Sequence, residues 1–198
     1  MRRLIVSAWM TLDGVVQAPI GPDEDRDGGF RHGGWHRPHT VDPVFQRRMT
    51  ASIAGAGAYV FGRRTYEEFA AFWPNAPEAE QAVARPLNER PKYVASRTLA
   101  APLPWAHATL LPGDAVAGVD VLKRESGGDL LVFGSTQLVG ALAAHDLIDE
   151  YRLVIDPVLA GGGKRIFRDD GALRTLRLVD HEVTGSGAIL ATYVPADR

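Results

Sequence analysis

The chain has 198 residues, of which 45% are apolar and 23% are charged, and its formal net charge is -2. This length and composition predict one globular domain over residues 1–198 with a sizeable core. The 22 basic and 24 acidic side chains form no polybasic run, which argues against nucleic acid as a partner. Cysteine is absent, which excludes disulfides, thiolate metal ligands and cysteine nucleophiles.

The opening stretch MRRLIVSAWMTLDG has two arginines followed by apolar residues, a faint resemblance to a signal peptide. The apolar run is short, contains Ser7 and ends at Asp13, so a first strand is the better interpretation. No segment approaches the apolar length needed to cross a bilayer. We therefore expect a cytoplasmic protein with no membrane partner.

Short β-type runs alternate with helical patterns along the chain. The predicted strands are Leu4–Trp9, Ala58–Phe61, Lys92–Ala95, Ala108–Leu111, Leu130–Phe133 and Tyr151–Ile155. The predicted helices are Val44–Ala54, Thr65–Phe72, Glu78–Asn88, Ala115–Arg124 and Thr136–His145. Two alternating runs around the glycines near Ser186 predict a closing hairpin. This order predicts an α/β fold with a mixed, mainly parallel sheet covered by helices on both faces.

One irregular region interrupts this alternation. The segment Ala18–His39 is rich in glycine, proline and charge and predicts a long loop. A long loop in a compact domain is usually functional or disordered. Its histidines, His32, His36 and His39, suggest a metal site, but Pro38 and the glycines argue against the helical geometry that would align them. No metal is therefore expected.

Small, hydroxyl-bearing and basic residues follow three of the predicted parallel strands. The three loops are Gly62-Arg63-Arg64-Thr65, Ser96-Arg97-Thr98 and Gly134-Ser135-Thr136. The carboxyl ends of parallel strands lie along one edge of the sheet, and ligands bind in the crevice there. Two of the loops open helices, whose free N–H groups favour an anion, and arginine adds bidentate donors suited to phosphate. The set predicts a ligand with more than one phosphate, such as a dinucleotide.

Each loop taken alone also fits ordinary turn and capping chemistry. Ser135 is a good candidate to cap the helix that follows it, and Arg64 could pair with Glu67 or Glu68 on its own helix. The segment GGGKR at residues 161–165 lacks the spacing of a P-loop, and no G-x-G-x-x-G follows a strand. The repetition along one edge, with arginine in two of the loops, favours the phosphate interpretation.

Four motifs occur in order along the chain: VSAWMTLDG, FGRRTYEEF, YVASRTL and LLVFGSTQLVGALAAHDLIDEYRLVIDPVLAGGGKRIF. Together they resemble the dihydrofolate-reductase-like family, and most closely the reductase domain of the bifunctional riboflavin-biosynthesis deaminase-reductase, here as a stand-alone relative. The resemblance implies an eight-stranded mixed sheet flanked by helices, an NADPH-dependent reductase activity and a homodimer.

The resemblance also implies a role for each of the three loops. The loop Gly62–Thr65 would lie against the cofactor. The loop Ser96–Thr98 would meet the adenosine 2′-phosphate through Arg97, and Gly134–Thr136 would carry the pyrophosphate. A glycine at position 134 would let the backbone approach the phosphates closely.

The first helix departs from dihydrofolate reductases proper. Those enzymes place a carboxylate there to help protonate the pterin, whereas this chain offers Gln46, Arg47 and Arg48. The chain also lacks the zinc signature of an attached deaminase domain. We expect hydride transfer from NADPH to a small heterocyclic substrate, pterin-like or pyrimidine-like, and this chemistry needs no metal.

Four residues are candidates for the substrate side. The resemblance would place Asp13 near the nicotinamide, where it could orient substrate or a proton-relay water, although it also fits a simple Asp-Gly turn. Asp42, just before the first helix, is the second catalytic candidate. Trp35 and His36 belong to the long loop, whose glycines could let it close over substrate. A surface loop without a ligand fits the same residues.

Two other functions stay open from the sequence. Because no clear catalytic acid is present, the chain could bind a flavin or another nucleotide on the same fold without turnover. It could also act mainly by binding a partner through Ala18–His39.

Overall fold

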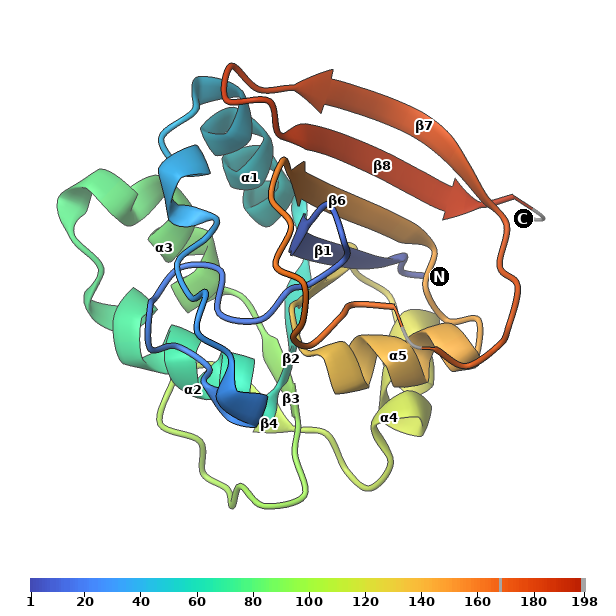
Figure 1. Cartoon of the computed structure of the whole chain (residues 1–198). Helices are drawn as coiled ribbons and strands as arrows, with labels where there is room; N and C mark the ends of the chain where they lie inside the picture. Colours follow the sequence, from blue (N-terminus) through green and yellow to red (C-terminus); the bar gives the residue numbers. More distant parts are fainter. Residues whose placement is uncertain (168, 197–198) are drawn as a thin grey trace.

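The computed structural model describes residues 1–167 and 169–196, which fold around one eight-stranded sheet (Figure 1). The strands lie in the order β4-β3-β2-β5-β1-β6-β8-β7. Their bounds are β1 Leu4–Thr11, β2 Ala58–Gly62, β3 Lys92–Ala95, β4 Ala108–Leu110, β5 Leu130–Phe133, β6 Glu150–Asp156, β7 Leu176–Val183 and β8 Ile189–Pro195. The first six strands pair in parallel, and β8 is antiparallel to both β6 and β7. The predicted mixed sheet with its closing hairpin is confirmed.

Helices cover both faces of the sheet, as the sequence predicts. They are α1 Pro43–Gly55, α2 Arg63–Phe72, α3 Gln81–Glu89, α4 Ala115–Arg124 and α5 Thr136–Ala144. Figure 1 shows α1, α2 and α3 on one side of the sheet, with α4 and α5 on the other. Among the described residues, no helix has the length and apolar character required to cross a membrane.

The central strands alternate their side chains between two apolar cores. Leu4 and Val6 of β1 pack in the core shared with α4 and α5, whereas Ile5 packs in the core shared with α1, α2 and α3. All four residues of β5 are buried. A strand covered on both faces is apolar throughout, which explains why Leu130–Phe133 has no alternating pattern.

The predicted helices occur in the structure, with small differences at their ends. The third one begins as a 3-10 turn, Glu78–Glu80, and becomes α-helical only in α3. The second begins at Arg63, directly after β2, two residues earlier than expected. That earlier start matters for function because it moves the amino terminus of α2 to the edge of the sheet.

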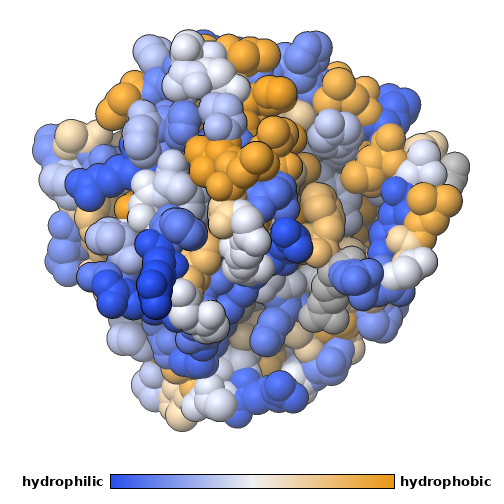
Figure 2. Space-filling view, viewed as in Figure 1, coloured by the Kyte–Doolittle hydropathy of each residue, from blue (hydrophilic) through white to orange (hydrophobic). Residues whose placement is uncertain are grey.

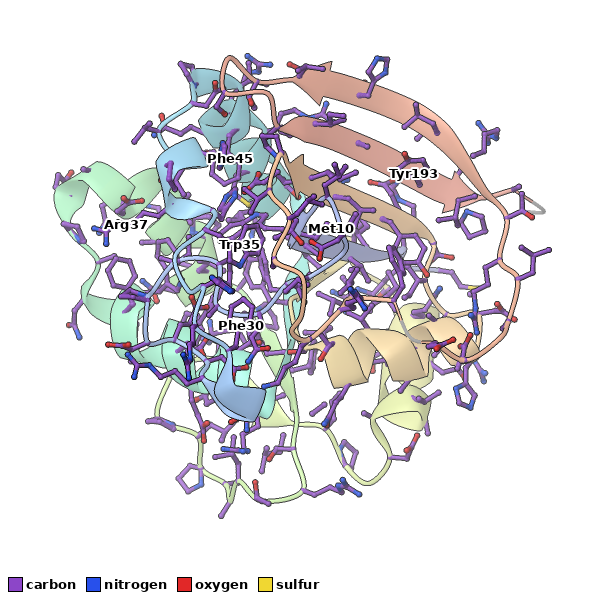
Figure 3. The ribbon with its side chains drawn as sticks, viewed as in Figure 1. Met10, Phe30, Trp35, Arg37, Phe45 and Tyr193 are labelled. Carbon is purple, nitrogen blue, oxygen red and sulfur yellow. The ribbon has the colours of Figure 1, made fainter. Side chains whose placement is uncertain are left out.

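Residues 18–39, which we call the strap, are irregular but ordered by their own small core. Two 3-10 turns, Asp27–Gly29 and Arg37–His39, interrupt the strap. Phe30 and Trp35 are buried in one cluster with Val15, which lies in the loop after β1. Figure 3 shows both aromatic side chains within the strap. The strap is therefore a packed part of the fold and can position side chains near the sheet edge.

Lys92, at the start of β3, is a fully buried cation that ties this strand to the end of α3. Its Nζ donates hydrogen bonds to the carbonyl oxygens of Leu87 at 2.7 Å, Asn88 at 3.1 Å and Arg90 at 2.8 Å. Nζ also lies 4.6 Å from the ring centroid of Trp105. Burial lowers the pKa of Lys92 to about 8. The carbonyl groups at the end of α3 thus depend on one side chain for a donor.

We expect Lys92→Met to lower the free energy of unfolding by about 1–3 kcal/mol, because buried carbonyl oxygens lose their donor while the side-chain volume is nearly kept. Urea unfolding measures the change. Arg124→Met is the control, since the Arg124 side chain is 68% exposed in an ion pair within α4 and its loss should change stability by less than about 0.5 kcal/mol. Equal effects of the two variants would contradict the assignment.

Candidate functional site

The three loops singled out in the sequence lie next to one another at the carboxyl edge of the sheet. They follow β3, β2 and β5, which are consecutive in the sheet. Gly62 at the end of β2 is aligned with Ala95 at the end of β3. The loops after β1 and β6 continue the same edge, since these strands come next in the order. This edge is where ligands bind in open α/β sheets.

Ser135 joins the loops after β2 and β5. Its Oγ accepts a hydrogen bond from the Gly62 backbone N–H at 3.0 Å and lies 3.0 Å from Thr65 Oγ1. A Cβ at Gly62 would lie 2.6 Å from Ser135 Oγ, so a larger residue there would push the loops apart. Gly134 and Ser135 both have left-handed backbone, with φ values of 48° and 55°. The two loops therefore form a single surface.

The prediction that the Ser135 hydroxyl caps α5 is wrong. Ser135 occupies the N-cap position, but its side chain makes no capping hydrogen bond because its Oγ faces Gly62 in the neighbouring loop. No side chain caps α2 either, where Gly62 is the N-cap residue. Two helices thus begin at this edge with their first N–H groups uncapped by side chains, an arrangement that favours anions.

The three arginines of the predicted site differ in their partners. Arg63 pairs with Glu67 one turn along α2, at 3.0 Å. The sequence offered Glu67 and Glu68 of the same helix as partners for Arg64, but in the structure Arg64 pairs with Asp27 of the strap. Arg97 is exposed and makes no hydrogen bond or ion pair with the rest of the described chain. Of the three, Arg97 is the arginine whose donors are available to a ligand.

Asp13 stabilises a turn, and its carboxylate is fully engaged. It accepts hydrogen bonds from Thr11 Oγ1 at 2.6 Å, Ala160 N at 3.0 Å and Gly161 N at 2.9 Å. These bonds, led by the one from Thr11, lower the pKa of Asp13 to about 2. Gly14, with φ of 82°, completes the predicted Asp-Gly turn. An ionised carboxylate with these partners orients the loop after β6 and has no proton to donate at neutral pH.

Asp42 also has structural partners. Its Oδ1 accepts from the N–H groups of Val44 at 2.8 Å and Phe45 at 3.4 Å, which makes it the N-cap of α1. Its Oδ2 accepts from Gly185 N at 2.8 Å, in the turn between β7 and β8. These contacts hold α1 against the hairpin, and they leave neither oxygen without a backbone donor.

Trp35 and His36 are buried anchors of the strap rather than exposed groups. The Trp35 Nε1–H donates to the Gln17 carbonyl oxygen at 2.8 Å. His36 Nδ1 lies 2.7 Å from Asp156 Oδ2, and both side chains are 0% exposed. Trp9 stacks on the imidazole with ring centroids 4.5 Å apart. In this structure neither predicted substrate residue reaches the surface of the edge.

The sequence interpretation missed Asp156 and Lys164. Asp156 ends β6 beside Thr11 of β1, and its Oδ1 and His36 Nε2 have no hydrogen-bond partner within the described chain. Lys164 pairs with Asp27 at 2.9 Å. Asp156 directly follows the apolar run Leu153–Ile155 at the carboxyl end of a parallel strand, a position that could have drawn attention to it. Nothing local in GGGKR identifies the partner of Lys164.

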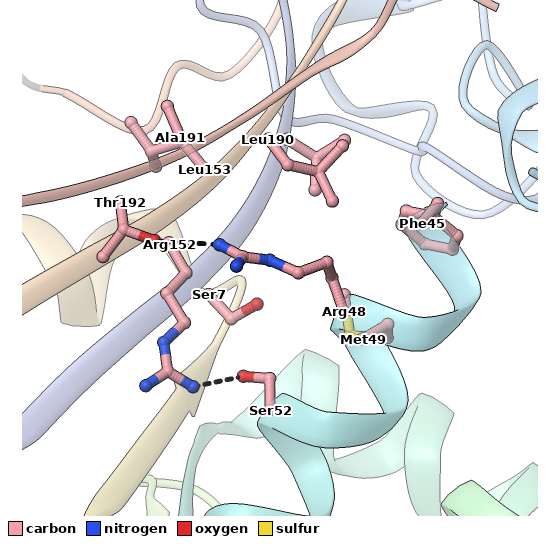
Figure 4. Close-up of a pocket in the computed structure, with 11 residues that line it drawn as sticks. Ser7, Phe45, Arg48, Met49, Ser52, Arg152, Leu153, Leu190, Ala191 and Thr192 are labelled. Carbon is pink, nitrogen blue, oxygen red and sulfur yellow. Dashed lines mark hydrogen bonds between the residues drawn. The ribbon is translucent and has the colours of Figure 1, made fainter. Parts of the chain in front are cut away.

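A hollow lies between α1 and the sheet (Figure 4). Arg152 Nη1 donates to Ser52 Oγ at 2.8 Å, and Arg48 Nη2 donates to Thr192 Oγ1 at 3.4 Å. The hollow is lined by Ser7, Phe45, Arg48, Met49, Ser52, Arg152, Leu153, Val154, Leu190, Ala191 and Thr192. None of these side chains is a carboxylate, so the lining offers donors and apolar surface.

The amino-acid sequence matches the family model described as RibD C-terminal domain over residues 2–190. Uncharacterized protein YyaP of Bacillus subtilis (strain 168) is 25% identical over 198 residues, covering 97% of this chain and 94% of the relative. Uncharacterized protein YwjB of the same strain is 24% identical over 198 residues, covering 98% of this chain and 99% of the relative.

Three solved structures share the fold. A putative riboflavin biosynthesis protein from Shewanella sp. PV-4 has a TM-score of 0.65 at 20% identity and 98% coverage of both chains. A pyrimidine reductase-like protein from Corynebacterium diphtheriae has a TM-score of 0.64 at 13% identity, covering 98% of this chain and 92% of that one. Dihydrofolate reductase from Enterococcus faecalis, complexed with NADP(H) and RAB-propyl, has a TM-score of 0.61 at 14% identity, covering 98% and 97%.

We expect Asp13→Asn to destabilise the protein at neutral pH, because the amide replaces one of the two accepting oxygens with an NH2 donor and its remaining oxygen accepts less strongly than a carboxylate. The folded pKa of about 2 lies below the ordinary 3.8, so the stabilisation is fully present above 3.8 and is lost as pH falls through about 2. Urea unfolding of both proteins at several pH values measures this. A difference in stability that stays constant down to pH 2 would contradict the assignment.

Proposed function

The chain belongs to the RibD C-terminal domain family, and on that premise we propose that it is an NADPH-dependent reductase of a small heterocyclic substrate. The observation that carries the proposal is the joining of the loops after β2 and β5 by Ser135, beside the loop that bears Arg97. One surface thus combines two helix amino termini and an available guanidinium. A diphosphate with an additional phosphate suits that combination.

The cofactor would lie along the three neighbouring loops. The backbone of Gly134–Thr136 and the start of α5 would bind the pyrophosphate, because the left-handed turn leaves room for close approach. Gly62–Thr65 would form the adjoining wall. Ser96–Thr98 would hold the adenosine end, with Arg97 on the 2′-phosphate. The fold shared with a dihydrofolate reductase complexed with NADP(H) supports this placement.

NADPH, when bound, supplies the hydride, and the chain's own residues position the reactants. Asp13 fixes the loops after β1 and β6 against each other, and these loops would flank the nicotinamide end. The strap covers part of the same edge and would exclude water from it. Since Asp13 is ionised and Asp42 caps a helix, we propose positioning roles for both rather than proton donation.

The hollow on the α1 face supports a pyrimidine-like substrate over a pterin-like one. Its lining contains Arg48 and Arg152 and no carboxylate. A pterin presents amino and ring N–H donors, which a carboxylate would satisfy, whereas an oxygen-rich pyrimidine presents acceptors. Arg48 pairs with Asp180 and Arg152 with Glu150, but each guanidinium has five N–H donors, so donors beyond those used in these pairs would complement the acceptor-rich ring.

A second candidate function is binding of a flavin or another nucleotide without turnover. The observation that favours it is the engagement of both catalytic candidates, Asp13 and Asp42, in structural hydrogen bonds. Flavin absorption in the purified protein would support this function. Oxidation of NADPH in the presence of any member of a panel of pterins, pyrimidines and carbonyl compounds would reject it.

Titration of the purified protein with NADPH and with NADH, followed by nicotinamide fluorescence, tests the reductase proposal. We expect saturable binding of NADPH and weaker binding of NADH. Absence of binding by both would reject the proposal. The homodimer expected from the resemblance stays a separate prediction, which light scattering would test.

We expect Arg97→Ala to weaken NADPH binding by about 1–3 kcal/mol, because one charged hydrogen-bonding partner of the 2′-phosphate is lost. NADH lacks that phosphate, so its affinity should stay within experimental error. The same titration measures both values, with Arg124→Ala of α4 as a charge-matched control remote from the edge. Equal weakening of NADPH and NADH would remove Arg97 from 2′-phosphate recognition.

A further inference from the structure

We propose that Arg64 and Lys164 form a phosphate-binding site in which the chain's own Asp25 and Asp27 take the place of the phosphate. The identity of the natural ligand rests on the reductase function proposed above. The site itself rests on a set of ion pairs between three distant segments: the strap, the start of α2 and the loop after β6.

The two cations converge on the same carboxylate oxygens. Asp27 Oδ2 accepts from Lys164 Nζ at 2.9 Å and also from Arg64 Nη1. Asp25 Oδ2 pairs with Lys164 Nζ and lies 3.6 Å from Arg64 Nη1. Each carboxylate oxygen is thus shared by a guanidinium and an ammonium group. Phosphate oxygens are bound in the same way, and a phosphate group brings more charge than one carboxylate.

This cluster adjoins the proposed cofactor surface. Arg64 comes two residues after Gly62, whose N–H contacts Ser135. Figure 1 shows the strap's first 3-10 turn, Asp27–Gly29, beside α2. In the space-filling view of the same side, polar and charged side chains predominate over this lower region (Figure 2). Arg64 would therefore be close enough to contact a phosphate that enters or leaves the loops after β2 and β5.

A cleft gives a ligand access to Lys164 and Asp27 of this cluster. It runs between strap residues 27–32 and the loop residues 160–164, and Gln17 completes its lining. Five of the lining residues are glycines: Gly28, Gly29, Gly161, Gly162 and Gly163. At these glycines no side chain keeps a ligand from the backbone. Asp27 itself lines the cleft, so the carboxylate and an incoming phosphate would compete for one place.

Of the two carboxylates, Asp27 is the exchangeable one. Its side chain is 52% exposed, whereas that of Asp25 is 19% exposed. Asp25 is also held by Gln17 Nε2 at 3.2 Å, so it fixes the strap while Asp27 faces the cleft. Exposed ion pairs contribute little net free energy, so a more highly charged anion can replace Asp27.

Ion pairs within one helix differ from this one, whereas Arg47–Glu182 also joins distant segments. Arg124 and Asp120 pair within α4, four residues apart, as is common on helix surfaces. Lys164 and Asp27 are 137 positions apart and come from segments that border the same cleft. A network of this kind could simply fasten the strap. That alternative predicts lower stability on removal of Asp27 and no gain in phosphate affinity, so binding measurements separate the two.

The test compares the full-length wild type with Asp27→Asn, Lys164→Met and the control Asp120→Asn. Inorganic pyrophosphate, measured by calorimetry, is the first probe and NADPH fluorescence the second. We expect Asp27→Asn to bind pyrophosphate about two- to fivefold more tightly, as loss of one exposed ion-pair competitor implies. Lys164→Met should bind it more weakly, and Asp120→Asn should match the wild type. Circular dichroism verifies that each variant is folded.

The outcomes keep this proposal separate from the proposed function. Unchanged or weaker pyrophosphate binding in Asp27→Asn, together with unchanged binding in Lys164→Met, would overturn the phosphate site. NADPH binding to the wild type would leave the reductase proposal standing in that event. If the wild type binds no NADPH but the variants shift pyrophosphate affinity as expected, the phosphate site stands and the reductase proposal fails.

Discussion

The hydrogen bond from the Gly62 backbone N–H to Ser135 Oγ is the interaction on which the candidate site depends. Parallel pairing of β2 with β5 brings the two loops to the same edge, but it does not fix how they meet. The serine hydroxyl does so, and Gly62 supplies the space. Because that hydroxyl is used between loops, it does not cap α5, whose amino terminus remains directed to the edge. The Ser135 hydroxyl thus both joins the two loops and leaves the amino terminus of α5 without a side-chain cap, where it can bind an anion.

The strap lies beside the joined loops at this edge of the sheet. Polar side chains attach it near α1 and near α2. The buried pair of His36 and Asp156 fastens the end near α1, while Asp27 and Lys164 form the exposed attachment near α2. The two attachments differ in their surroundings. The first is enclosed by aromatic rings, including Trp9 and Phe45, whereas the second borders an open cleft. Motion of the strap, where a ligand requires it, should therefore begin at the acidic end, because exposed ion pairs break more easily.

The sequence predicted the helices and strands of this fold well. Each element shows which of its faces is buried through the spacing of its own apolar residues, and that spacing can be read locally. β3 and β5 have the predicted bounds, and α4 does as well. Predictions about side-chain partners were less successful because a partner is set by the tertiary structure. His36 and Asp156 are 120 positions apart, and neither residue's neighbours indicate the other. The same holds for Arg64, whose nearest acids in sequence lie on its own helix although its partner lies in the strap.

Hydrogen exchange measured with and without NADPH tests the central claim most directly, since the proposed donors are backbone amides at known positions. We expect slower exchange in Gly62–Thr65 and Gly134–Thr136 when the cofactor is bound, and also slower exchange near Arg97. Exchange in β7, which lies at the far edge of the sheet, should change little. Saturating NADPH that slowed exchange elsewhere and left both loops unchanged would contradict the account.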